Sequence, residues 1–129
     1  MKRFSIRDGM GVERLRKICR IETGIITGET SASVMKRAEK LQITALYLGI
    51  KDKAALLDGI LLQKELRADE VAFIGDDVND IGIMNRVGLT ACPQDAMPQV
   101  AAIVDFHCTQ KGGYGAFREF AEWLIALQA

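Results

Sequence analysis

Short β-rich runs alternate with longer segments of helical period along this chain, and no other feature limits the fold as strongly. Strands that are separated by helix-length segments pair in parallel, and the helices then cover both faces of the sheet. We expect five strands and five helices in this order. The strands are predicted at 21–27, 45–49, 71–75, 89–92 and 102–108, and the helices at 31–43, 52–67, 79–86, from Asp95 onward, and 115–128. The prediction is an α/β fold, a three-layer Rossmann-like parallel sheet in one domain spanning residues 1–129.

Charge and cysteine content exclude several classes of function. Seventeen basic and seventeen acidic side chains give a formal net charge of zero, so the sequence favours neither a nucleic-acid nor an anionic-membrane partner. The three cysteines are widely spaced and form no CxxC pair, which indicates a reducing compartment. No apolar run approaches the length of a membrane span or follows the basic start as in a signal peptide. We therefore expect a cytoplasmic protein.

Residues that suit a phosphate group follow the first two predicted strands. In "TGET", Thr27 offers a hydroxyl beside backbone N–H groups at the start of a helix. Ordinary turn and capping chemistry, with Ser31 or Thr30 as the cap, is the alternative. Lys53 begins the 52–67 helix, where its charge opposes the helix dipole unless an anion or carboxylate lies nearby; the alternative is a solvated surface lysine. Ligands of open α/β sheets bind beyond the carboxyl ends of the strands, where both residues are expected.

The stretch "VAFIGDDVND" places Asp76, Asp77, Asn79 and Asp80 behind the third predicted strand. Mg²⁺ would offset the repulsion among these carboxylates, since it takes oxygen ligands from one or two carboxylates together with water and phosphate. Capping of a helix start is the alternative, although it accounts for only one or two of the aspartates. A hydroxyl, a lysine and metal-binding carboxylates on successive strand ends suit phosphoryl transfer.

The order "IITG", "KDKAAL", "GDDVND" resembles the second, third and fourth motifs of haloacid dehalogenase-superfamily phosphatases. The segments "FSIRDGMGVERL" and "KGGYGAFREF" are similar to the cap-less, tetrameric branch whose members act on 3-deoxy-octulosonate 8-phosphate or nonulosonate 9-phosphates. The resemblance covers essentially the whole chain. It implies a Mg²⁺-dependent phosphatase that hydrolyses a sugar-acid phosphate in surface-carbohydrate precursor synthesis, working as a cytoplasmic homotetramer.

The resemblance also implies roles for single residues. Thr27 and Lys53 would hold the phosphoryl group, and Asp77 would contact Lys53 or metal-bound water. Asp76 would bind Mg²⁺, with Asp80 as the second carboxylate of the metal centre, behind the direct ligand. The substrate-binding residues would be Arg7, Gly28, Glu29, Lys40, Asn79 and Arg118. In the family the glycine-rich tail, here including Gly112 and Gly113, reaches into a neighbouring subunit's site; a flexible turn before the last helix is the alternative.

The substrate is partly indicated by Glu29. Most octulosonate-phosphate enzymes carry "TGR" at the second motif, whereas Glu29 followed eleven residues later by Lys40 resembles the nonulosonate 9-phosphate phosphatases. A carboxylate and an ammonium group at a pocket rim could address sugar hydroxyls and the sugar-acid carboxylate. Alternatively, both are solvated residues of a helix face.

The family's first motif, an Asp-x-Asp-Gly segment on the first strand, has no counterpart in this sequence. That motif supplies the nucleophile and the acid/base aspartate, and Asp8, Asp52 and Asp58 all lack its context. Its strand is central in the family's sheet, so two neighbouring strands should be left unpaired in the middle of the fold. We expect an N-terminally truncated phosphatase domain; a non-catalytic, oligomerising or binding homologue is the alternative, and whether the chain is an enzyme stays open.

Overall fold

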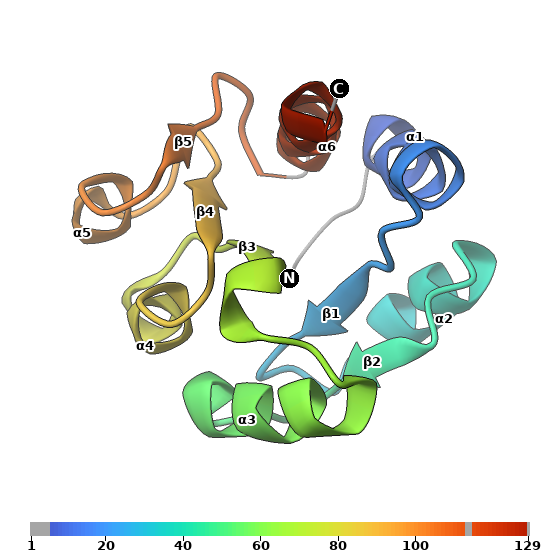
Figure 1. Ribbon diagram of the computed structural model, residues 1–129, viewed down its shortest axis with the longest axis horizontal. Helices are drawn as coiled ribbons and strands as arrows, with labels where there is room; N and C mark the ends of the chain where they lie inside the picture. The colour runs from blue at the N-terminus through green and yellow to red at the C-terminus, as the bar shows by residue number, and fades with distance from the viewer. Residues whose placement is uncertain (1–5, 113–114, 129) are drawn as a thin grey trace.

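Helices and parallel strands alternate in the computed structural model, which describes residues 6–112 and 115–128 (Figure 1). The strands are β1 (Gly24–Ile26), β2 (Ala45–Tyr47), β3 (Ala72–Ile74), β4 (Leu89–Cys92) and β5 (Phe106–His107). The α-helices are α1 (Ile6–Arg14), α2 (Ala32–Lys40), α3 (Lys53–Lys64), α4 (Ile81–Met84), α5 (Pro98–Ala101) and α6 (Ala116–Gln128). Shorter helical turns are η1 (Leu15–Cys19), which is π-helical, and the 3-10 turns η2 (Ala68–Glu70) and η3 (Val78–Asp80).

The strands form two parallel half-sheets. One is β1–β2 and the other is β3–β4–β5. Within the described residues, no strand pairing joins β1 to β3. Ile26 of β1 and Phe73 of β3 nevertheless pack against the same apolar cluster, so the half-sheets share one core. The prediction of a sheet that lacks its central strand and leaves two neighbouring strands unpaired is confirmed.

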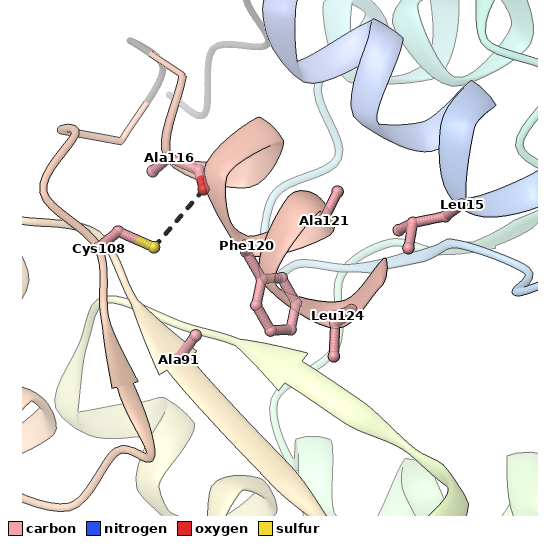
Figure 2. Packing of buried hydrophobic residues seen from close by; sticks show 7 residues of the cluster. All are labelled: Leu15, Ala91, Cys108, Ala116, Phe120, Ala121 and Leu124. Atoms are coloured by element: carbon pink, nitrogen blue, oxygen red, sulfur yellow. Dashed lines mark hydrogen bonds between the residues drawn. The ribbon is translucent and has the colours of Figure 1, made fainter. Parts of the chain in front are cut away.

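Helices cover both faces of the half-sheets, as the three-layer prediction requires. Figure 1 shows α1, α2 and α6 on one side of the strands and α3, α4 and α5 on the other. On the first side, Phe120 and Leu124 of α6 pack in one cluster with Ala91 of β4 (Figure 2). On the second side, Leu57 of α3 packs in one cluster with Cys92 of β4. Burial of these apolar side chains supplies the main driving force for folding.

Two elements of the last third differ from the sequence-based expectation. The helix expected from Asp95 begins at Pro98, whose fixed φ suits the first helical position. The strand expected over 102–108 is reduced to β5, because Ala102 and Ile103 continue the turn of α5: their N–H groups donate to the carbonyls of Pro98 at 3.0 Å and Val100 at 3.1 Å. The Asp105 carboxylate accepts hydrogen bonds from the Thr90 N–H at 2.9 Å and from its hydroxyl at 3.1 Å. A short apolar run does not by itself distinguish strand from helix.

Two side-chain caps start the helices that follow β1 and β2. Ser31 caps α2 by accepting a hydrogen bond from the Ser33 N–H at 3.2 Å, and Asp52 caps α3 by accepting one from the Ala55 N–H at 3.0 Å. The prediction of Ser31 or Thr30 as a cap is thus resolved in favour of Ser31. Among the described residues, no helix has the length and apolar character needed to cross a bilayer.

Candidate active site

Thr27 lies at the carboxyl end of β1 and is 3% exposed. Its hydroxyl oxygen accepts a hydrogen bond from the Glu29 N–H at 3.1 Å, and its carbonyl accepts one from the Ile50 N–H at 3.0 Å. These contacts fix the loop after β1 against the loop after β2. Because the hydroxyl oxygen is held as an acceptor, its hydrogen can point toward an acceptor from outside the loop, such as a phosphate oxygen.

Lys53 and Asp80 form a buried ion pair behind the strand ends. Their side chains are only 6% and 1% exposed, and the Lys53 ammonium donates to Oδ1 of Asp80. The interpretation of Lys53 as a solvated lysine is therefore wrong: a carboxylate offsets its position at a helix start, as the dipole argument requires. The carboxylate that binds Lys53 is Asp80, and a contact of Asp77 with metal-bound water, the other expectation for Asp77, stays a prediction.

The second oxygen of Asp80 organises the loop that follows β3. Oδ2 accepts hydrogen bonds from the N–H groups of Asp76 at 3.1 Å and Asp77 at 3.3 Å. The Asp77 carboxylate in turn accepts from the Val78 N–H at 2.6 Å, which is capping chemistry. The capping alternative thus describes Asp77. Because both Asp80 oxygens are bound by protein donors, the structure shows Asp80 holding the loop, and its part in a metal centre stays a prediction.

Asp76 is exposed at the end of β3. Its backbone is held on both sides, by Asp80 at the N–H and by the Met97 N–H, which donates to its carbonyl at 3.0 Å. No group of three or more His, Cys, Asp or Glu side chains that could hold a metal is present among the described residues. Mg²⁺ usually takes only one or two carboxylates from a protein and completes its coordination with water and phosphate oxygens, so one exposed carboxylate on a fixed backbone suits it.

The remaining predicted residues fall into two sets. Gly28, Glu29 and Asn79 lie in the loops at the carboxyl ends of β1 and β3, beside Thr27 and Asp76. Lys40 is the last residue of the nine-residue α2, about 13 Å along the helix axis from its start near the site. Within a single chain, the structure therefore does not bring Lys40 to Glu29.

The two predicted arginines belong to α1 and α6. Arg118 lies in the first turn of α6, and its Nε donates to Glu122 at 2.8 Å. Arg7 lies in α1, with its side chain outside the described part of the structure, and Gly113 lies outside the described residues altogether. The substrate-binding roles of these residues stay predictions.

Gly75, which the motif analysis did not single out, is required by the packing of the site. A Cβ at this position would lie 2.8 Å from Oδ2 of Asp80 and 2.8 Å from Cε1 of Phe73. Only glycine lets the backbone approach the Asp80 carboxylate this closely. The available signal was a glycine placed directly between an apolar run and a group of aspartates.

Comparisons with known proteins agree with this geometry. The family model of haloacid dehalogenase-like hydrolases matches residues 21–115. The 3-deoxy-D-manno-octulosonate 8-phosphate phosphatase KdsC of Escherichia coli K12 is 35% identical over 128 residues, which is 99% of this chain and 68% of the relative.

Two solved structures show the same fold. The 3-deoxy-D-manno-octulosonate 8-phosphate phosphatase of Yersinia pestis matches with a TM-score of 0.91 and 37% identity, over 98% of this chain and 68% of its own. The enzyme of the same name from Moraxella catarrhalis, in complex with magnesium, phosphate and KDO, matches with a TM-score of 0.92 and 32% identity, over 98% of this chain and 72% of its own. By its family match, its relatives and the order of its strand-end residues, this chain belongs to the haloacid dehalogenase-like hydrolases.

Proposed function

We propose that this chain forms the main part of a Mg²⁺-dependent phosphatase that acts on a sugar-acid phosphate. The Lys53–Asp80 pair carries the proposal, because a buried lysine fixed at the carboxyl edge of the strands places a cation where a phosphoryl group would bind. Thr27 at the end of β1 would donate its hydroxyl hydrogen to a phosphate oxygen. Both groups would offset the charge on the transferring phosphoryl group.

Asp76 would provide the protein ligand for Mg²⁺. Its carboxylate is exposed, while Asp80 holds its N–H, so the donor set fits a hard cation that keeps waters and takes phosphate oxygens as further ligands. When bound, the metal would supply Lewis-acid stabilisation of the phosphoryl oxygens. A magnesium ion accompanies phosphate in the M. catarrhalis relative, which supports this choice of metal. Replacing Asp76 with alanine should abolish Mg²⁺ binding measured by calorimetry; unchanged binding would refute the assignment.

The nucleophile would come from a strand between β1 and β3. Parallel to both, such a strand would end between Thr27 and Asp76, and an Asp-x-Asp there would face Lys53 across the site. One aspartate would attack the phosphorus to give an aspartyl-phosphate and release the sugar hydroxyl, and water would then hydrolyse the intermediate. The 129 residues contain no such motif, which supports the alternative of a non-catalytic homologue that binds phosphate or metal.

The relatives and the sequence point to two related substrates. KdsC and the Y. pestis protein are phosphatases of 3-deoxy-D-manno-octulosonate 8-phosphate. Glu29 instead supports a nonulosonate 9-phosphate, and its place in the loop after Thr27 puts it at the rim of the proposed phosphate site. We propose the sugar-acid phosphates as the class, with turnover in a cytoplasmic homotetramer.

Phosphate release with Mg²⁺ tests the proposal directly. Both substrates should be offered to the 129-residue chain and to a chain extended upstream to any in-frame Asp-x-Asp. Hydrolysis by the extended chain alone supports the phosphatase with a nucleophile from the added strand. If neither chain hydrolyses either substrate, the non-catalytic homologue is favoured, and hydrolysis by the short chain would refute the account of the nucleophile.

A further inference from the structure

A polar cavity lies at the opposite end of the β1–β2 half-sheet from Thr27. Its volume is about 360 Å³. Thr23 and Thr44, which line it, directly precede the first residues of β1 and β2. Arg16 and Arg20 of the α1–η1 segment also line it, together with Gln42 from the end of α2. The candidate active site uses none of these residues.

Two guanidinium groups give this cavity a positive character. Nη2 of Arg16 donates to the carbonyls of Leu41 at 3.1 Å and Gln42 at 3.2 Å. These contacts use one of its nitrogens and hold the guanidinium in place. In the described part of the chain, the Arg20 side chain makes no hydrogen bond or ion pair, while its backbone N–H donates to the Leu15 carbonyl. Glu22 is the one carboxylate of the lining, and it is paired with Lys64 at 3.0 Å. The charges of the two guanidinium groups are therefore not neutralised by an ion pair within the lining.

The backbone at this cavity is strained at two residues that are not glycine. Arg20 has φ +56° and Gln42 has φ +58°, in the left-handed region that costs an ordinary residue energy and that glycine adopts readily. Each of these residues ends a helical segment, a position where glycine is the usual choice. Both instead carry polar side chains that line the cavity. Glu65 at the end of α3 has the same conformation, with φ +55°, and does not line the cavity, so the left-handed turns alone do not mark a binding site.

A hydroxyl at the cavity also has no partner. Oγ1 of Thr23 is buried, and no hydrogen-bond partner for it exists in the described structure. An unsatisfied buried hydroxyl is costly to keep and calls for an explanation. Because this oxygen has almost no accessible surface, it lies behind the wall of the cavity and is not itself a contact for a ligand there.

We infer that this cavity is a second binding site, and that it takes the oxyanion of a small metabolite, either a phosphate or a carboxylate group. Guanidinium groups bind both through charge-assisted hydrogen bonds. The Gln42 amide, which also lines the cavity, can add a neutral donor. Since the site lies at the amino ends of the strands, its ligand does not compete with a substrate at Thr27.

Nuclear magnetic resonance of the ¹⁵N-labelled 129-residue chain tests this inference. Inorganic phosphate and acetate are titrated separately at constant ionic strength and without Mg²⁺. We expect saturable shifts of the Thr23 and Thr44 amides and of the Arg20 Nε–H. Tighter binding of phosphate would identify the ligand as phosphorylated, and tighter binding of acetate as a carboxylate. Shifts confined to Thr27 and Gly28, or no saturable shifts, would overturn the inference.

Two variants separate a built site from general charge attraction. Arg20→Gln should weaken binding about tenfold, the effect of losing one charge-assisted hydrogen bond. Lys17→Gln removes the same charge three residues earlier, from an exposed lysine paired with Glu13, and should leave the affinity unchanged. Equal weakening by both variants would refute a specific site.

Discussion

Loss of the Lys53 charge should destabilise the fold far more than loss of an exposed lysine on the same helix. Lys53→Met leaves the Asp80 carboxylate, 1% exposed, with two backbone N–H donors but without its cation. Removing one partner of a buried ion pair costs about 3–5 kcal/mol. Lys64→Met is the matched control, because the Lys64–Glu22 pair is partly exposed and such pairs contribute about 0–1 kcal/mol.

Urea denaturation followed by the fluorescence of Trp123, which stacks on Phe106 with ring centroids 4.8 Å apart, measures these losses. Domains of this size are stable by about 5–15 kcal/mol, so Lys53→Met should lower the unfolding midpoint strongly and Lys64→Met only slightly. The double variant Lys53→Met/Asp80→Asn should lose less than the sum of the two single variants, since it leaves no charge unpaired. Equal stability of the two methionine variants, or strictly additive losses, would refute the buried-pair argument.

Two further predictions concern packing and pH. Gly75→Ala should cost about 1–3 kcal/mol through overpacking, because its Cβ would lie 2.8 Å from Asp80 and Phe73. In Gly59→Ala the added Cβ would have nothing within 4 Å, so this variant should stabilise α3 by about 1 kcal/mol. Similar denaturation midpoints for the two variants would contradict the geometry. Burial raises the pKa of the Cys108 thiol from 9.0 to about 12, so the unfolded thiol ionises first and the free energy of unfolding should fall between these pH values. Cys108→Ala should lack this part of the fall. Parallel pH profiles of the two proteins would show that folding does not change the pKa of the Cys108 thiol.

The sequence predicts the site best where an apolar run marks a strand clearly and a polar residue suited to phosphate or metal follows it. Thr27, Lys53 and Asp76 follow or adjoin the ends of strands whose apolar character is unambiguous. Pairing of β1 with β2 brings Thr27 and Lys53 to one edge, and the Lys53–Asp80 pair holds the loop of Asp76 beside them. Which carboxylate turns inward could not be predicted, because Asp77 and Asp80 differ only in how the 3-10 turn after β3 orients them. That orientation depends on the close approach allowed at the preceding glycine.

The limits elsewhere have similar causes. The apolar run over 102–108 fits both a strand and a helix, and its first two residues continue the turn of α5 instead of starting β5. The sequence does not predict the helix at 6–14, because glycines and charged residues interrupt its apolar positions. Val12, 1% exposed, lies on the face that this helix buries. The cavity at the amino ends of β1 and β2 depends on two left-handed residues that no propensity marks, since glycine is absent from both positions.

The division into two half-sheets has a consequence for cooperativity. Backbone ladders normally transmit stability across a sheet, but here the coupling between the halves passes through side chains. It comes from the apolar cluster that Ile26 and Phe73 share, from the Lys53–Asp80 pair, and from α1 against α6, where Arg14 binds Glu122. We therefore expect the two halves to be coupled less tightly than neighbouring strands of one sheet. Whatever pairs with both inner strands would fuse these two units into one that opens as a whole.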